Sequence, residues 1–182
     1  EKIFLPTIQA MNAEGCPFKG CLYFGLMLTP DGPKVIEYNC RFGDPETQVV
    51  LPLLKTDLLT IMQAVENETL ADLSVEWSDG AAACVILASG GYPVAYEKGK
   101  PISGLVDGQL PGEENVTVYH SGTAITEDGQ LVTNGGRVLG VTAIGPRLTN
   151  ALSHAYEAAE KIHFDKLHKR SDIGARALAA MQ

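Results

Sequence analysis

The chain has 182 residues, of which 45% are hydrophobic and 20% are charged, and its mean hydropathy of +0.03 is typical of a globular protein. Its formal net charge of -8 argues against a general nucleic-acid or anionic-membrane surface, because those partners select for clustered Lys and Arg. No apolar stretch reaches the roughly 20 residues of a membrane-spanning helix and no signal peptide opens the sequence, so we expect a cytoplasmic protein without nucleic-acid or membrane partners.

Four cysteines occur in the chain, and they form no CxxC pair and have no histidine at zinc-binding spacing. We therefore expect reduced thiols in an intracellular protein rather than disulfides or a cysteine metal site. The first residue is not methionine, and residues 1–15 run directly into a helical pattern. This start favours a chain that begins inside a larger protein.

The first half of the chain is predicted to form a helix, a β-hairpin and two further helices. Ile3, Phe4, Ile8 and Met11 have the near-helical spacing of an amphipathic helix. Two apolar runs of strand length follow, and the turn-forming sequence TPDGP at residues 29–33 separates them. This pattern predicts the hairpin.

Helical periodicity returns after the hairpin, and proline divides it. Asp44 is predicted as the N-cap and Pro45 as the first residue of a helix. Pro52 must break or kink that helix, because proline lacks a backbone N–H and clashes with the preceding turn. Thr56 or Asp57 is predicted to cap a second helix.

The second half changes to short β-rich runs punctuated by glycine, which predict a small antiparallel sheet. These runs cover residues 81–89, 115–126, 130–134 and 136–145. Apolar residues at helical spacing after Pro146 predict a C-terminal helix packed on that sheet. The chain is therefore expected to be an α+β protein with two domains, residues 1–75 and 76–182.

Polar side chains end the second strand of the hairpin. In a strand, alternate residues face the same side, so Val35, Glu37 and Asn39 should share one face. A carboxylate and an amide carbonyl side by side are oxygen ligands that Mg²⁺ accepts, with water and nucleotide phosphates filling the other positions. The spacing therefore indicates a metal site at Glu37 and Asn39.

The residues after Asn39 are of types that bind an anionic ligand. Arg41 offers paired donors to a phosphate or carboxylate, and Gly43 lets a backbone approach a ligand closely. A helix beginning at Asp44 and Pro45 would direct free N–H groups and the positive end of its dipole toward the same ligand. Each residue alone has a simpler interpretation, a solvated strand face or a helix cap. Their coincidence within a dozen residues favours a functional site.

The sequence VIEYNCRFGDPETQ at residues 35–48 resembles that of glycinamide ribonucleotide synthetases, the phosphoribosylamine-glycine ligases of the ATP-grasp superfamily. Four further motifs resemble that family's C-terminal domain in the same order: ASGGYP at 88–93, HSGT at 120–123, TNGGRVL at 133–139 and SDIGARAL at 171–178. The resemblance covers effectively the whole chain. It implies the C-terminal part of an ATP-grasp domain in residues 1–75 and the family's C-terminal domain in residues 76–182.

The resemblance implies an ATP-dependent carbon-nitrogen ligase of purine biosynthesis. Members join glycine to 5-phosphoribosylamine through a glycyl phosphate, giving glycinamide ribonucleotide, ADP and phosphate, with Mg²⁺ or Mn²⁺ as the metal. The match includes neither the family's N-terminal domain nor the lysine-bearing part of the ATP-grasp domain, so the chain alone is expected to be inactive and to bind ATP poorly. The parent protein is expected to be a monomer or a fusion with other purine enzymes.

The same resemblance implies roles for residues of the hairpin. Glu37 and Asn39 would hold the Mg²⁺ ions that bridge the ATP phosphates, and Met27 would either touch adenine or be a simple core methionine. Gly25 stands where many ATP-grasp enzymes carry another metal-binding carboxylate. Which residues complete the ligands of a second metal ion is therefore left open. Arg41 would stabilise the transferring phosphate or acyl phosphate.

Three further residues are assigned to the substrates by the resemblance. Gly43 would line the substrate site, and Arg137 would bind the ribose phosphate. Asp44 would anchor a substrate amine in the catalytic site, or it would only cap the helix. Two alternatives remain: a sibling ATP-grasp ligase, which would carry a different sequence after the metal-binding glutamate, and a non-catalytic module that binds a phosphate ligand or a partner protein.

Overall fold

The computed structural model describes residues 2–181, and the contacts within the chain divide them into two compact units. Unit 1 comprises residues 2–46 and Leu54–Trp77, and unit 2 comprises Thr47–Leu53 and residues 78–181. The predicted division into domains at residues 75 and 76 stays a prediction. No helix within the described residues combines the length and the apolar composition that crossing a membrane requires.

Unit 1 contains the predicted N-terminal helix and hairpin. Helix α1 is Phe4–Ala13, and strands β1 (Tyr23–Thr29) and β2 (Gly32–Asn39) pair antiparallel around the turn that TPDGP predicts. The ring of Phe24 packs between two other rings, with centroids 4.5 Å from Phe4 and 5.3 Å from Tyr38. These three aromatic side chains hold α1 against the hairpin.

Unit 1 buries few side chains. Gly43 and Ala64 are the only buried residues among those that the structure describes in this unit, whereas Leu28 is 83% exposed. Two strands make too little contact to form a core by themselves, because a stable sheet needs a third strand or a covering helix on its apolar face. The hairpin therefore presents much of its apolar surface to solvent.

The predicted helix start at Asp44 and Pro45 is wrong. Residues 44–46 form a turn, and helix α2 begins only at Thr47 and ends at Val50. The Glu46 side chain lies against Gly43, since a Cβ added at that glycine would overlap a carboxylate oxygen of Glu46. The segment is thus folded back on itself where the first helical turn was expected.

Pro52 and the second helix behave as predicted. α2 gives way to the 3₁₀ turn η1 (Leu51–Leu53), because Pro52 has no N–H with which to continue the α-helical hydrogen bonds. Helix α3 is Leu58–Glu66, and an oxygen of its N-cap Asp57 accepts a hydrogen bond of 2.8 Å from the Thr60 N–H. This confirms the predicted cap. A 3₁₀ turn, η2 (Leu70–Asp72), follows.

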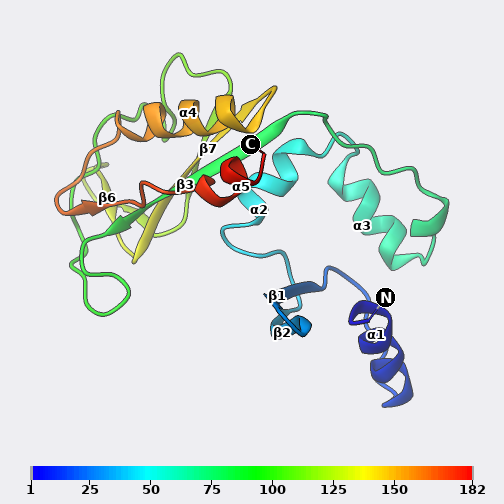
Figure 1. Cartoon of the computed structure of the whole chain (residues 1–182). Coiled ribbons are helices and arrows are strands. Elements are labelled where there is room, and N and C mark those ends of the chain that lie inside the picture. Colours follow the sequence, from blue (N-terminus) through cyan, green and yellow to red (C-terminus); the bar gives the residue numbers. More distant parts are fainter. Residues whose placement is uncertain (1, 182) are drawn as a thin grey trace. The chain divides into compact units, whose positions relative to one another are not determined.

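Unit 2 is built on a four-stranded antiparallel sheet, which confirms the predicted α+β class. The strand order is β4 (Val116–His120), β7 (Arg137–Gly145), β3 (Ala81–Ser89) and β8 (Leu167–His168). Strands β5 (Thr123–Ile125) and β6 (Leu131–Thr133) form a separate pair. Helix α4 (Leu148–Ala159) lies along β3 and β7 (Figure 1).

The core of unit 2 lies between the sheet and α4. Leu87 and Leu139 are fully buried on β3 and β7, and Ala155 is fully buried on the helix. Alanine on the inner face of a helix lets it approach a sheet closely, in keeping with the dense packing of protein interiors. The helix begins at Leu148, two residues after the predicted start at Pro146.

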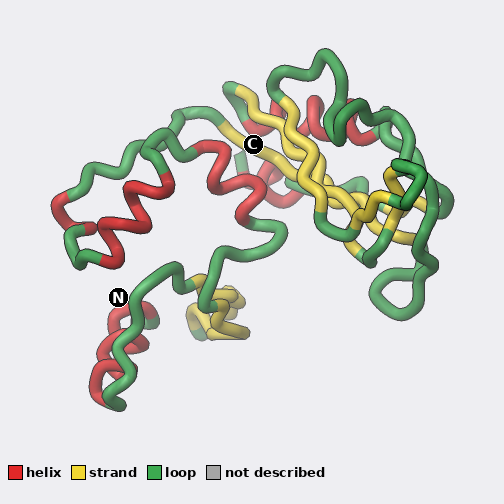
Figure 2. The backbone as a smooth tube through the Cα atoms, turned by 180° about the vertical axis from the view of Figure 1, so that it is seen from behind, coloured by secondary structure: helices red, strands yellow, loops and turns green. Residues whose placement is uncertain are grey.

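Two elements of unit 2 were not predicted. Strand β8 has two residues and helix α5 is Ala175–Ala180, and both are too short for a periodic pattern to mark them. Between β3 and β4, residues 90–115 form neither helix nor strand and run as an extended loop (Figure 2). This loop carries the last four residues of the ASGGYP motif.

Candidate functional site

The polar pair at the end of β2 lies together. The amide nitrogen Nδ2 of Asn39 donates a hydrogen bond of 3.1 Å to Oε1 of Glu37. The strand pairing is interrupted beside them: Glu37 pairs with Gly25 and Val35 with Leu26, so the register shifts by one residue. The regular alternation predicted from Val35 onwards is thus broken, but the two polar residues still share one side of the strand end.

Gly25 provides space for the Glu37 side chain. The two residues face each other across the hairpin, and a Cβ added at Gly25 would lie 2.9 Å from Cγ of Glu37. Real Cβ atoms do not approach other atoms so closely, so a residue with a side chain here would push the carboxylate aside. Gly25 therefore has a steric role beside Glu37.

Tyr23 and Glu46 join this neighbourhood and were not predicted. Tyr23 pairs with Asn39 across the hairpin. The pKa of its phenol is raised, first by burial, next by the negative charge of Glu46 and a hydrogen bond to it, and last by the charge of Glu37. Sequence spacing could not reveal this group, because it depends on the strand register and on the turn before α2.

The other predicted residues of unit 1 follow the hairpin or lie on it. Nη1 of Arg41 donates a hydrogen bond of 3.0 Å to the carbonyl oxygen of Phe42. Gly43 is buried and Asp44 is exposed. Helix α2 begins at Thr47, three residues after Asp44, so Asp44 does not directly precede the helix.

Met27 is not a core residue of unit 1. It lies on β1 opposite Lys34, and its side chain is 54% exposed. The alternative of a simple core methionine is therefore wrong for this unit. An exposed, unbranched thioether side chain remains able to adapt to a flat aromatic ligand.

Arg137 belongs to unit 2, where it is the first residue of β7 and pairs with Ala88 of β3. Gly135 and Gly136 precede it and are here called the glycine bend. A Cβ added at Gly122 would lie 2.6 Å from the Cα of Gly135, so the two glycines pack backbone to backbone. The N–H of Asn134 donates a hydrogen bond of 2.7 Å to the Gly122 carbonyl. The HSGT and TNGGRVL motifs therefore meet immediately before Arg137.

The oxygen ligands at the end of β2 suit a hard cation that keeps some of its water ligands. Glu37 and Asn39 supply a carboxylate and an amide oxygen, and within residues 2–181 no group of three or more His, Cys, Asp or Glu residues could enclose a metal. Mg²⁺ is usually bound by one or two protein oxygen ligands, waters and substrate phosphates rather than by an all-protein cage. The pair can supply two ligands of such a cation.

The chain is similar in sequence to a curated protein and in sequence and fold to a solved structure. The chain is 50% identical over 175 residues to phosphoribosylamine-glycine ligase of Caldanaerobacter subterraneus, covering 96% of this chain and 40% of that protein. The crystal structure of phosphoribosylamine-glycine ligase from Thermotoga maritima matches 91% of this chain and 39% of that one, with a TM-score of 0.76 and 39% sequence identity. The chain thus spans about two fifths of the length of these relatives.

A fusion protein also contains a related segment. The chicken (Gallus gallus) trifunctional purine biosynthetic protein adenosine-3 is 52% identical over 180 residues, which cover 98% of this chain and 18% of that protein. Family models match both parts of the sequence: phosphoribosylglycinamide synthetase, ATP-grasp (A) domain, over residues 1–47, and phosphoribosylglycinamide synthetase, C domain, over residues 82–176. Since the second model alone matches more than half of the chain, the chain belongs to the phosphoribosylglycinamide synthetase family.

Proposed function

We propose that this chain is the C-terminal part of an ATP-dependent ligase that joins glycine to 5-phosphoribosylamine. The products would be glycinamide ribonucleotide, ADP and phosphate. The observation that carries the proposal is the hydrogen-bonded pair of Glu37 and Asn39 at the end of β2, in a chain of this family. The names of its relatives support the same reaction.

We assign the metal site to Glu37 and Asn39. When bound there, Mg²⁺ would neutralise charge on the nucleotide phosphates during phosphoryl transfer to glycine. The hydrogen bond between the two side chains uses one oxygen of Glu37 and leaves its other oxygen and Oδ1 of Asn39 as ligands. Mn²⁺ should replace Mg²⁺, because both cations prefer carboxylate, carbonyl and water ligands.

We assign the acyl-transfer step to the residues after β2. Arg41 would hold the transferring phosphate or the glycyl phosphate with its guanidinium fork, which suits planar, bidentate binding of oxyanions. Asp44 is exposed and would anchor a substrate amine, and the backbone at Gly43 would line the same substrate. Met27 would touch the adenine of ATP.

We propose that Arg137 binds the ribose phosphate of 5-phosphoribosylamine. It is the first residue of a strand in the sheet of unit 2, so its backbone is fixed by pairing with Ala88. A guanidinium on a rigid strand loses little freedom when it binds a phosphate. The amine of the same substrate would then attack the carbonyl carbon of glycyl phosphate and release phosphate.

We further propose that residues 1–75 complete an ATP-grasp domain and that residues 76–182 form the C-terminal domain of the parent enzyme. The Caldanaerobacter relative is about two and a half times as long as this chain, which agrees with a part of a longer ligase. The parent would be a monomer or, as the name of the chicken protein indicates for that relative, part of a multifunctional polypeptide.

The decisive experiment measures phosphate release by the full-length parent. Release should require glycine, 5-phosphoribosylamine, ATP and a divalent cation together. Replacement of glycine by formate or bicarbonate should abolish it, which separates this reaction from those of sibling ligases. Phosphate release that does not depend on glycine would contradict the proposal, and no release with any substrate would favour a non-catalytic binding module.

A further inference from the structure

The glycine bend before Arg137 is fixed by hydrogen bonds from a single serine. The N–H of Ser89 donates a bond of 2.8 Å to the Gly136 carbonyl, and its hydroxyl Oγ donates a bond of 2.8 Å to the Gly135 carbonyl. Ser89 is the last residue of β3 and is only 5% exposed. Two successive carbonyl groups are therefore held from one side by a buried residue.

An aromatic ring holds the same bend from a second direction. A Cβ added at Gly136 would overlap ring atoms of Tyr92 and lie 2.9 Å from its Cγ, so the ring occupies the space of a side chain at that position. The Tyr92 ring also meets the Tyr96 ring edge to face, with centroids 5.9 Å apart. Only glycine can stand at residue 136 while Tyr92 keeps this place.

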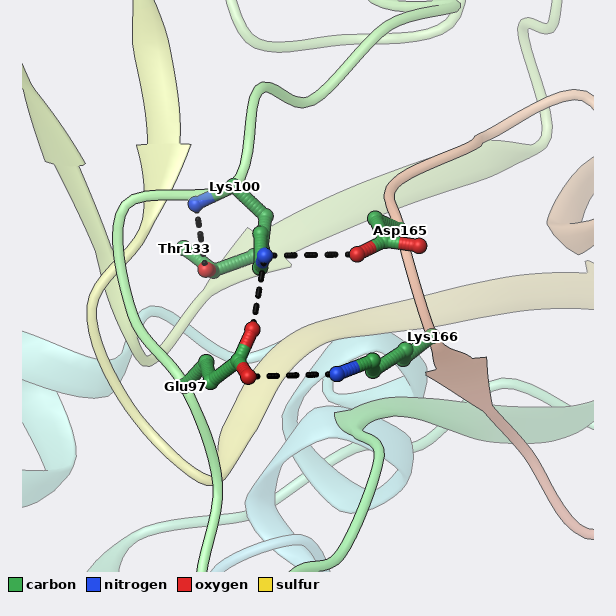
Figure 3. Close-up of polar contacts among 5 residues, drawn as sticks. All are labelled: Glu97, Lys100, Thr133, Asp165 and Lys166. Atoms are coloured by element: carbon green, nitrogen blue, oxygen red, sulfur yellow. Dashed lines mark hydrogen bonds and ion pairs between the residues drawn. The ribbon is translucent and has the colours of Figure 1, made fainter.

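The segment that carries Tyr92 is tied down at its far end. Glu97 pairs with Lys100 at 2.7 Å and with Lys166 at 3.1 Å, and Lys100 also pairs with Asp165 at 3.3 Å (Figure 3). The N–H of Lys100 donates to the hydroxyl of Thr133 at 3.1 Å, and the Thr133 N–H donates to the Lys100 carbonyl at 2.9 Å. Residues 92–100 therefore begin against Gly136 and return to the end of β6.

We propose that Ser89 and Tyr92 are positioning residues for Arg137. They fix the peptide groups of Gly135 and Gly136, and so they set the direction in which the Arg137 side chain leaves the sheet. The inference rests on the proposed function, in which Arg137 binds the phosphate of a phosphoribosyl substrate. A displacement of about 1 Å in such a group can cost as much as about 100-fold in rate or binding.

The test uses the full-length ligase in the reverse direction, with glycinamide ribonucleotide, ADP and phosphate as reactants and glycine, 5-phosphoribosylamine and ATP as products. Ser89→Ala and Tyr92→Ala should each raise the KM for glycinamide ribonucleotide at least about 5-fold and change kcat and the KM for ADP less than about 2-fold. Tyr92→Phe keeps the ring and should behave as the natural protein. Ser121→Ala removes an exposed hydroxyl near the same bend and is the matched control for Ser89→Ala.

The contact between the ring and the glycine has its own test. Gly136→Ala should raise the KM for glycinamide ribonucleotide, because the new methyl group displaces the Tyr92 ring. The double variant with Tyr92→Ala and Gly136→Ala should have a KM no higher than Tyr92→Ala alone, since the collision is then absent. A double variant with additive losses would overturn the role of this contact.

Arg137→Ala separates this inference from the proposed function. If Arg137→Ala leaves the KM for glycinamide ribonucleotide unchanged, the assignment of Arg137 to the phosphate is wrong. If Arg137→Ala raises that KM while Ser89→Ala and Tyr92→Ala do not, the positioning role is wrong and the assignment stands. Thermal unfolding of each variant is measured in parallel, and where Tyr92→Ala is unfolded at the assay temperature, Tyr92→Leu takes its place under the same criteria.

Discussion

The side chains of Asn39 and Glu37 are joined by a hydrogen bond of 3.1 Å at the end of β2. Glu37→Gln keeps the shape of the side chain and removes its charge. Loss of a residue that only orients a metal ligand costs about 10- to 100-fold in affinity or activity, so loss of the proposed ligand Glu37 should lower turnover of the proposed full-length ligase at least about 100-fold. Initial rates of phosphate release over a range of Mg²⁺ concentrations measure the effect.

Asp31→Asn is the matched control for that variant. It removes one carboxylate charge from the exposed hairpin turn of the same unit and should leave the rate within about 2-fold, because an exposed charge at a distance is screened by salt. Near-normal turnover of Glu37→Gln at saturating Mg²⁺ would show that the metal is held elsewhere.

Gly25→Ala should weaken the proposed metal site without replacing either of its ligand residues. The added methyl carbon would lie 2.9 Å from Cγ of Glu37, so the carboxylate must move. We expect the Mg²⁺ concentration for half-maximal activity to rise about 10-fold, as for other changes that only reorient a ligand. In a Glu37→Ala background the same substitution should have no further effect, and an additive loss there would mean that Gly25 acts on something other than Glu37.

Local sequence patterns predicted most elements of the fold. Turn chemistry at residues 29–33 and the cap Asp57 act within a few residues of the structure they specify, so the hairpin and α3 could be predicted. The start of α2 could not, because Asp-Pro is equally compatible with a turn and with a helix N-terminus. In the observed turn the Glu46 side chain lies against Gly43, a contact that residue propensities do not describe.

Periodicity alone could bring together only candidate residues that are close in sequence, whereas Met27 and Arg137 were named through the family resemblance. Glu37 and Asn39 are two apart on a strand, and the strand period brought them together. Tyr23 lies beside Asn39 because of the register of the hairpin, and Ser89 bonds to Gly135, 46 residues away in the sequence. Contacts over such separations depend on the tertiary fold, so single-sequence patterns could not reveal them.

Leu87→Ala should destabilise unit 2 strongly. Leu87 is fully buried among β3, β7 and α4, and removal of a buried leucine side chain costs about 2 to 5 kcal/mol in free energy of unfolding. Hydrogen exchange of the paired amide protons of β7 measures this change within unit 2 alone. Ile125→Ala is the control, because Ile125 is 73% exposed and its truncation should cost less than about 0.5 kcal/mol. Equal effects of the two variants would contradict the assignment of the core.

Glu97 should titrate at unusually low pH. Hydrogen bonds and charge from Lys100 and Lys166 hold the pKa of its carboxyl below the usual range of a glutamate. Since the folded pKa is depressed, the stabilisation by these pairs is present above the ordinary glutamate pKa and is lost as pH falls through the lowered value. Carboxyl NMR titration of Glu97 in the isolated chain measures the shift.

Two lysine variants identify the cause of that shift. Lys100→Met should raise the pKa of Glu97 more than Lys166→Met does, because Lys100 makes the larger contribution. Lys98→Met is the control, since Lys98 is adjacent in sequence and is not among the ion-pair partners described for Glu97 in residues 2–181. An equal response to all three variants would indicate a general charge effect in place of the specific pairs.

The isolated chain should bind Mg-ATP only weakly. Nucleotide sites bury most of their ligand between several elements, whereas Met27 and Glu37 lie on an exposed two-stranded hairpin with little packed around it. We expect a Kd above about 1 mM by isothermal titration calorimetry, which corresponds to less than about 4 kcal/mol of binding free energy. The full-length ligase, titrated under the same conditions, is the positive control. Micromolar binding by the chain alone, abolished by Glu37→Gln, would show that this part of the protein already contains a complete nucleotide site.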